Sequence, residues 1–309
     1  ELRHPMGPVE CAEVMPGGDR AVTCSKSGGC VVWDVASGEA LRVFSAARAA
    51  TPLNLSTDIV VKDIQAFPDG RRVLTRGYKT SVIVWDIASG EKACECKGHS
   101  FAITTATVFP TSDRIITGSF DQMAIIWNVS TCSAIHTFRH AQWVTSVAVL
   151  RKGDQVATAA TDGTLRFWDA SGGQLLRELH IPGSDSVVFD VVYKLVPFPE
   201  DDRLATIDRD AVLIWNVTSG SVLHRLARDR DTVWGVAVSP GGDILATCNG
   251  QNLTVWDARS GEPLQTLVEP SMHRVEPRPG MRSCVISIGL GRVSDPQGFG
   301  RGLPWNGLP

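Results

Sequence analysis

The sequence has little of what membrane, nucleic-acid-binding or metal-dependent proteins need. Its 309 residues include no run of about eighteen apolar residues, the length that a transmembrane helix requires. Basic residues number 30 against 33 acidic ones, the pI is near 6.2, and no long basic run occurs. Nucleic-acid binding normally requires a basic surface, and a membrane span requires a long apolar run. We therefore expect neither nucleic acid nor a membrane as a partner.

Motifs of catalysis and metal binding are also missing. There is no Cys-x-x-Cys pair, no His-Glu-x-x-His sequence and no Gly-x-Ser-x-Gly elbow. Gly77-Tyr78-Lys79-Thr80 departs from a phosphate-binding loop, because Tyr78 separates the glycine from the lysine. We therefore expect no enzyme activity, no cofactor and no bound metal.

Eight cysteines are present, and none has the spacing of a zinc site. They are Cys11, Cys24, Cys30, Cys94, Cys96, Cys132, Cys248 and Cys284. Disulfides would indicate a secreted protein, whereas free cysteines within apolar runs act as small hydrophobic residues. Since most of the eight lie in apolar runs, we expect reduced core thiols in a cytoplasmic protein. Four Asn-x-Ser/Thr triplets favour secretion, but two of them arise where asparagine replaces aspartate in a repeat.

That repeat is a tryptophan followed by aspartate or asparagine, which recurs at intervals of 41 to 52 residues. The six copies begin at Trp33, Trp85, Trp127, Trp168, Trp215 and Trp256. Each tryptophan ends a short β-rich run, and five of the six copies continue into a glycine-containing turn such as VASGE at 35–39. A second turn rich in Pro, Gly and Asp lies upstream, as in FPDG at 67–70. Each period therefore predicts four antiparallel strands joined by turns.

Both faces of each predicted sheet carry apolar residues, as Val147, Val149, Val156, Leu165 and Phe167 show. One small sheet cannot bury both faces alone, whereas a circular stack gives every sheet two neighbours. The repeat resembles the WD-repeat family, which implies an all-β propeller of four-stranded antiparallel blades. Six recognisable blades are expected at about 5–44, 59–97, 99–138, 140–180, 186–227 and 231–268 within a propeller domain of residues 1–268.

Two regions depart from the repeat. The link Ser45–Asp58 is longer than the others, and residues 269–309 carry six prolines and seven glycines without a Trp-Asp pair. This tail is either a degenerate seventh blade or a disordered segment, so a six-bladed or a seven-bladed ring remains open. Because the chain starts at ELRHPMGPVE, without an initiator methionine, we expect it to be a piece of a longer protein.

The resemblance implies a buried hydrogen-bond tetrad that links the tryptophan indole to a hydroxyl, an imidazole and a carboxylate. The two complete sets are His99, Thr117, Asp121 and Trp127 in the third blade, and His140, Thr158, Asp162 and Trp168 in the fourth. A buried indole N–H needs an acceptor, which gives the network its physical reason. The Asp position holds Ser27 in the first blade and Lys79 in the second, so the middle blades are expected to be the most rigid.

Recognition of a partner is expected at the loops around the channel. Alignment of the first strands places Glu10, Lys62, Thr104, Thr145, Phe189 and Trp234 in one row. The predicted partner-binding residues are Trp234, Phe189, Lys62, Arg228, Arg230 and Asp190, because aromatic and arginine anchors are common in interfaces. The alternative is that Trp234 packs in the core between the fifth and sixth blades.

The leading hypothesis is a non-enzymatic, cytoplasmic protein-interaction scaffold that binds other proteins or peptides on this loop face. The alternative is a ligand-sensing or autoinhibitory WD array of a larger signalling ATPase. It rests on WDVASGE and WDIASGE, which resemble the repeats that follow NACHT or NB-ARC modules. The identity of the partner is not determined by these motifs.

Overall fold

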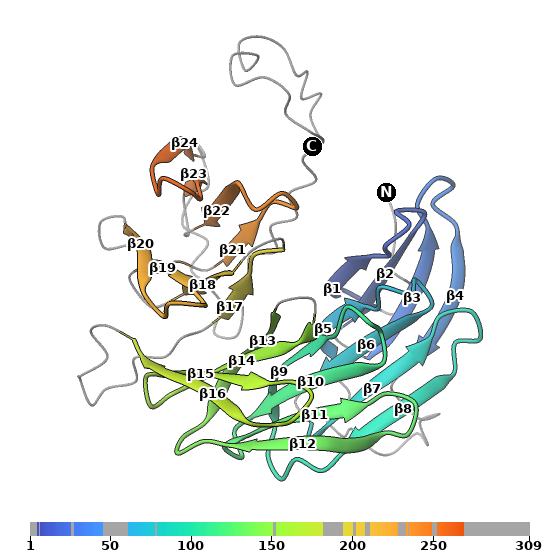
Figure 1. Ribbon diagram of the computed structural model, residues 1–309. Helices are drawn as coiled ribbons and strands as arrows, with labels where there is room; N and C mark the ends of the chain where they lie inside the picture. Colours follow the sequence, from blue (N-terminus) through green and yellow to red (C-terminus); the bar gives the residue numbers. More distant parts are fainter. Residues whose placement is uncertain are drawn as a thin grey trace. The chain divides into compact units, whose positions relative to one another are not determined.

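All elements described by the structure, a computed structural model, are β-strands (Figure 1). The described residues are 5, 7–25, 28–45, 61–77, 79–150, 153–181, 194–199, 202–207, 211–227, 233, 235–248 and 252–268. Within these ranges the protein has no helix with the length and hydrophobicity needed to span a bilayer. The 24 strands form six sheets, each of four antiparallel strands that follow one another in the sequence, which confirms the predicted all-β fold.

Each sheet has the order of a simple meander. The first three sheets are β1 Val9–Val14, β2 Arg20–Ser25, β3 Gly29–Asp34 and β4 Ala40–Ser45; β5 Val61–Ala66, β6 Arg72–Gly77, β7 Ser81–Asp86 and β8 Lys92–Lys97; and β9 Ile103–Val108, β10 Arg114–Ser119, β11 Met123–Asn128 and β12 Ser133–Arg139. The last three are β13 Val144–Leu150, β14 Gln155–Ala160, β15 Thr164–Asp169 and β16 Leu175–His180; β17 Lys194–Pro197, β18 Arg203–Ile207, β19 Ala211–Asn216 and β20 Val222–Ala227; and β21 Gly235–Val238, β22 Ile244–Cys248, β23 Asn252–Asp257 and β24 Pro263–Val268.

The chain divides into two compact units, Glu1–Val233 with the first five sheets and Trp234–Pro309 with the sixth. Within the first unit, apolar side chains pack between successive sheets. Leu74 and Cys96 of the second sheet share a buried cluster with Ile115 and Trp127 of the third. The other clusters join the first sheet to the second, the third to the fourth, and the fourth to the fifth. Stacking therefore buries both faces of the inner sheets, as the apolar pattern predicts.

The turn after each repeated tryptophan has one geometry. Its aspartate or asparagine accepts backbone N–H groups, as Asp86 does from Ser89 at 2.8 Å, and these bonds lower the pKa of the Asp86 carboxyl. Five residues after the tryptophan, Gly38, Gly90, Gly173, Gly220 and Gly261 all have left-handed backbones with φ between 73° and 76°. The third copy has Cys132 at this position, with φ of 57°. Glycine suits the position because it has no Cβ to clash with the backbone.

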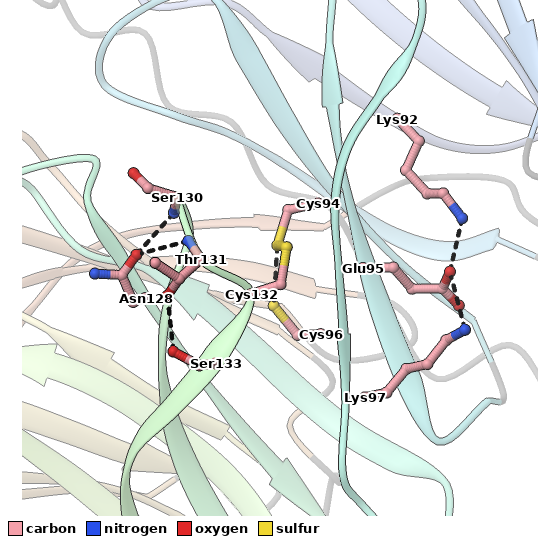
Figure 2. The surroundings of a disulfide bond; sticks show 10 residues. All are labelled: Lys92, Cys94, Glu95, Cys96, Lys97, Asn128, Ser130, Thr131, Cys132 and Ser133. Carbon is pink, nitrogen blue, oxygen red and sulfur yellow. Dashed lines mark hydrogen bonds and ion pairs between the residues drawn. A yellow bond between two sulfur atoms is a disulfide. The ribbon is translucent and has the colours of Figure 1, made fainter.

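The expectation that all cysteines are reduced is wrong. Cys24 of β2 is joined to Cys30 of β3. Cys94 of β8 is joined to Cys132 of the β11–β12 turn, as Figure 2 shows. Cys24 and Cys30 face each other across paired strands, while the second bond joins two different sheets. Pairing of strands and stacking of sheets bring these residues together, so their spacing in the sequence does not reveal the bonds. Among the described cysteines, Cys11, Cys96 and Cys248 do not form disulfides.

Two of the regions that depart from the repeat lie wholly or largely outside the described residues. These are the tail at 269–309 and nearly all of the long link Ser45–Asp58. Closure of a ring by six or seven blades therefore stays a prediction. The structure does determine that each of the six tryptophan repeats forms its own four-stranded sheet.

Candidate protein-binding surface

The third sheet contains a continuous hydrogen-bond chain from an indole to a carboxylate. Trp127 Nε1 donates to Thr117 Oγ1 at 2.8 Å, and Thr117 Oγ1 lies 2.7 Å from His99 Nε2. His99 Nδ1 lies 2.8 Å from Asp121 Oδ2. The His99 side chain is fully enclosed and that of Asp121 is 3% exposed. The four residues that the resemblance places in this tetrad therefore lie in one buried network.

The directions of these bonds follow from the two ends of the chain. The indole can only donate and the carboxylate can only accept, so Thr117 donates to Nε2 and Nδ1–H donates to Asp121. Burial lowers the pKa of His99, although Asp121 opposes this shift. The imidazole is therefore neutral near pH 7, with its proton on Nδ1. Such a network holds its members in place because every buried polar group in it is hydrogen-bonded to another member.

The fourth sheet departs from the predicted tetrad at its carboxylate. Trp168 donates to Thr158 at 2.9 Å, and Thr158 lies 2.8 Å from His140 Nε2, but His140 Nδ1 has no hydrogen-bond partner. Asp162 instead accepts from Thr164 N at 3.0 Å and from Arg166 Nη1 at 3.3 Å. The physical reason is Arg166, whose guanidinium attracts Asp162 at the strand position where the third sheet has Ile125.

The other sheets keep the bond between tryptophan and threonine. The indole-to-hydroxyl distances are 2.7 Å for Trp33–Thr23, 2.8 Å for Trp85–Thr75, 2.9 Å for Trp215–Thr206 and 2.9 Å for Trp256–Thr247. Lys79, which occupies the Asp position in the second sheet, is exposed. Ser27, which occupies the Asp position in the first sheet, lies outside the described residues. Within the described residues, the third sheet thus has the most extended network.

Hydrogen bonds tie together three loops around the two histidines. Ser119 Oγ donates to the Phe101 carbonyl at 3.0 Å, and Phe120 N donates to the Ala102 carbonyl at 3.1 Å. These bonds join the β8–β9 loop to the β10–β11 turn. His140 N donates to the Gln122 carbonyl at 2.9 Å, which joins that turn to the β12–β13 loop. The loops are therefore fixed to one another and to the buried network below them.

Each of these loops presents an exposed aromatic side chain. Phe101 is 64% exposed, Phe120 42% and Trp143 43%. The rings of Phe120 and Trp143 meet edge to face with their centroids 5.2 Å apart. We call Phe101, Phe120 and Trp143 the aromatic loop surface. Exposed apolar residues are common singly, but aromatic side chains gathered on linked loops are typical of a binding surface.

The structure describes only one of the six predicted partner-binding residues, Lys62. Trp234, Phe189, Arg228, Arg230 and Asp190 lie outside the described residues, so neither the anchor nor the core position of Trp234 is determined. Lys62 lies on β5 and forms an ion pair with Glu10 of β1 at 2.5 Å. Thr104, in the same predicted row, lies within hydrogen-bond distance of the Val144 carbonyl at 2.7 Å. Lys62 and Thr104 therefore link neighbouring sheets, so part of their hydrogen-bonding capacity is used within the protein.

Sequence reasoning missed the aromatic loop surface, although a signal was present. Phe101 lies two residues after His99, Phe120 directly precedes Asp121, and Trp143 lies three residues after His140. The tetrad residues mark the loops at one end of each sheet, so aromatic residues beside them belong to that end. No group of three His, Cys, Asp or Glu side chains that could hold a metal ion occurs in the described part of the chain.

Comparison with known proteins agrees with the repeat. Residues 90–128, 132–169 and 220–257 match the WD40 family, described as WD domain, G-beta repeat. Nuclear distribution protein nudF of Emericella nidulans is 22% identical over 179 residues, which cover 56% of this chain. The same alignment covers 32% of nudF, so the chain corresponds to about a third of that relative's length. Three of the six repeats therefore match the WD40 family, and they end at the Trp-Asn or Trp-Asp pairs of the third, fourth and sixth sheets.

Proposed function

We propose that this chain is a non-enzymatic scaffold that binds a protein partner on the aromatic loop surface. WD40 repeats in general serve protein interaction, which supports the class of function. The observation that carries the proposed site is the set of three exposed aromatic side chains on hydrogen-bonded loops. This site replaces, as the leading candidate, the row that the sequence predicts around Trp234.

The physical argument rests on exposure and rigidity together. Covering an aromatic side chain removes a large apolar area from water, and such residues are enriched among the anchors that dominate binding energy. Loops that are already hydrogen-bonded to one another lose little conformational entropy when a partner binds. Phe101 and Phe120 are held in this way through Ser119 and Ala102.

The surroundings of the aromatic residues indicate the chemistry of the partner. Ser100, Ala141 and Gln142 are exposed next to them and carry no charge. Asp121 does not add a free charge, because His99 and two backbone N–H groups occupy its oxygens. We therefore expect a peptide segment or protein face with apolar side chains, and we expect binding to depend only weakly on salt.

Site-specific photo-crosslinking tests the position of the interface. A photoreactive phenylalanine analogue replaces Trp143 in one version of the full chain and Leu175 of β16 in a matched version. Leu175 is 48% exposed, similar to Trp143, but lies on the outer strand of the fourth sheet. In extracts of the source cells, the analogue at 143 should form a specific adduct that the analogue at 175 does not form.

Affinity measurements with the crosslinked partner complete the test. Phe120→Ala combined with Trp143→Ala should weaken binding at least about 30-fold, the effect of losing about 2 kcal/mol from an anchor. Leu175→Ala should change the affinity less than about threefold. Full binding by the double variant, with its fold intact by circular dichroism, would show that the partner docks elsewhere.

Two broader expectations stay proposals. The first is the cytoplasmic location. The two disulfides argue against it, because such bonds persist mainly in oxidising compartments. Fractionation of the source cells with an antibody against the chain tests it. Membership in a larger signalling ATPase rests on the resemblance of the turns alone, and the gene upstream should encode a phosphate-binding loop if it is correct.

A further inference from the structure

Three cysteine sulfurs lie together where the second and third sheets meet (Figure 2). Cys94 and Cys96 are two residues apart on β8 and therefore project from the same face of the strand. Cys94 is bonded to Cys132, and Cys96 Sγ lies 3.6 Å from Cys94 Sγ. The Cα atoms of Cys94 and Cys132 are 5.7 Å apart, well within the range that a disulfide spans.

The position of Cys132 is unusual for its backbone. The five equivalent turns have glycine there, while Cys132 has φ of 57°. A side chain with a Cβ is disfavoured in this left-handed region. Bonds from Ser130 N and Thr131 N to Asn128 Oδ1, at 2.8 and 3.0 Å, close the turn without any help from the sulfur. The cysteine is therefore not explained by the needs of the turn.

We propose that Cys94 and Cys132 form a redox-controlled clamp between the second and third sheets, which a dithiol reductant opens through Cys132. The clamp joins β8, the outer strand of the second sheet, to the β11–β12 turn of the third sheet. Its two ends are separated by 38 residues in the sequence, so breaking the bond releases a contact between sheets.

The two cysteines of the bond differ in exposure, which favours attack by a reductant at Cys132. Cys132 is partly exposed in its turn, whereas Cys94 is 2% exposed. A thiolate of the dithiol attacks Cys132 Sγ, the sulfur–sulfur bond breaks, and Cys94 leaves as a thiolate that takes up a proton. The second sulfur of the dithiol then attacks the mixed disulfide and releases Cys132, which is also protonated. The protein gains two electrons and two protons, and the dithiol becomes a cyclic disulfide.

Cys96 lies beside the disulfide but does not exchange with it. It is fully buried, and burial raises the pKa of its thiol to about 12, with a further contribution from Glu95. Since a thiolate is the attacking species in exchange, Cys96 stays a thiol near neutral pH and does not displace Cys132. Its S–H is the donor toward Cys94 Sγ, because a disulfide sulfur carries no hydrogen.

Peptide mapping of the full chain tests the clamp directly. The chain is purified without reductant, denatured with N-ethylmaleimide and cleaved after lysine and arginine. Peptide 93–97 should then be linked to peptide 115–139, with maleimide on Cys96. Dithiothreitol added to the native chain before alkylation should abolish this link, and oxidised glutathione should restore it after the dithiothreitol is removed. Unlinked peptides in both conditions, or a link that native treatment cannot break, would overturn the proposal.

Hydrogen exchange separates a clamp from a passive bond. In the wild type, reduction should raise the exchange rate of β8 by about tenfold. Cys132→Gly restores the residue of the five sister turns and should fold, while its β8 should exchange at the same rate with or without dithiothreitol. Cys30→Ser removes the other disulfide and should keep the response of β8. Equal responses in the wild type and Cys132→Gly would refute the clamp.

Discussion

Replacing Asp121 with alanine removes the acceptor of three hydrogen bonds in the third sheet. The donors are His99 Nδ1 at 2.8 Å, Ser100 N at 2.9 Å and Met123 N at 3.0 Å. Ser100 is exposed, so its N–H can bond to water in the variant. The His99 side chain is fully enclosed, so its Nδ1–H loses its partner without gaining another.

The expected loss of stability follows from these partners. Leaving a buried donor unsatisfied costs about 1–3 kcal/mol, and the two backbone bonds to a charged acceptor add about 1 kcal/mol between them after exchange with water. We therefore expect Asp121→Ala to lower the free energy of unfolding by about 3 kcal/mol. The β8–β9 loop should also exchange its backbone hydrogens faster, because Asp121 no longer holds Ser100.

Asp162→Ala is the matched control in the fourth sheet. Asp162 accepts from Thr164 and Arg166, and Arg166 keeps a second carboxylate, Glu178, at 2.7 Å. Since His140 does not depend on Asp162, no buried imidazole loses its acceptor. The expected loss is about 1 kcal/mol, the contribution of an ordinary hydrogen bond.

Urea unfolding followed by circular dichroism measures both losses under the same conditions. A difference of about 2 kcal/mol between Asp121→Ala and Asp162→Ala is expected. Equal losses, or a larger loss for Asp162→Ala, would refute the conclusion that the carboxylate belongs to the buried network in the third sheet and not in the fourth.

Two further predictions concern the fourth sheet and the packing between sheets. Burial, with a smaller effect of Arg166, lowers the pKa of His140 from 6.5 to about 4, so the unfolded chain takes up a proton first as the pH falls. Between pH 7.5 and 5 the free energy of unfolding of the wild type should fall by about 2 kcal/mol more than that of His140→Gln, and parallel pH profiles in urea melts would contradict this. Gly118→Ala places a Cβ 2.7 Å from Val144 Cγ1 and 3.1 Å from Val147 Cγ1. It should cost about 1–3 kcal/mol by overpacking, and an unchanged melting temperature would count against this packing.

The sequence alone determined the six four-stranded sheets, for a local reason. The repeated tryptophan ends one strand, the residues after it close a turn, and a threonine nine or ten residues earlier accepts the indole N–H. All of these contacts lie within one hairpin or between adjacent strands. Patterns of hydrophobic residues and turns therefore predict them, and the resemblance to WD repeats named the third-sheet network residue by residue.

The competition at Asp162 required the tertiary structure. The residues of a complete tetrad are present in the sequence of the fourth sheet, yet the carboxylate lies with Arg166 and leaves His140 Nδ1 without a hydrogen-bond partner. Which donor Asp162 binds depends on side-chain positions within a few ångströms. A spacing pattern assigns residues to strands but does not resolve that choice.

Contacts between sheets were likewise decided by the fold. Cys94 and Cys132 belong to different sheets, and only the stacking of β8 against the β11–β12 turn brings their sulfurs together. Phe120 and Trp143 come from separate loops whose backbone hydrogen bonds set their rings edge to face. Such contacts depend on the angle and separation of neighbouring sheets, which arise from the packing of the whole core. The repeat pattern specifies each sheet, whereas the chemistry at their junctions follows from how the sheets pack.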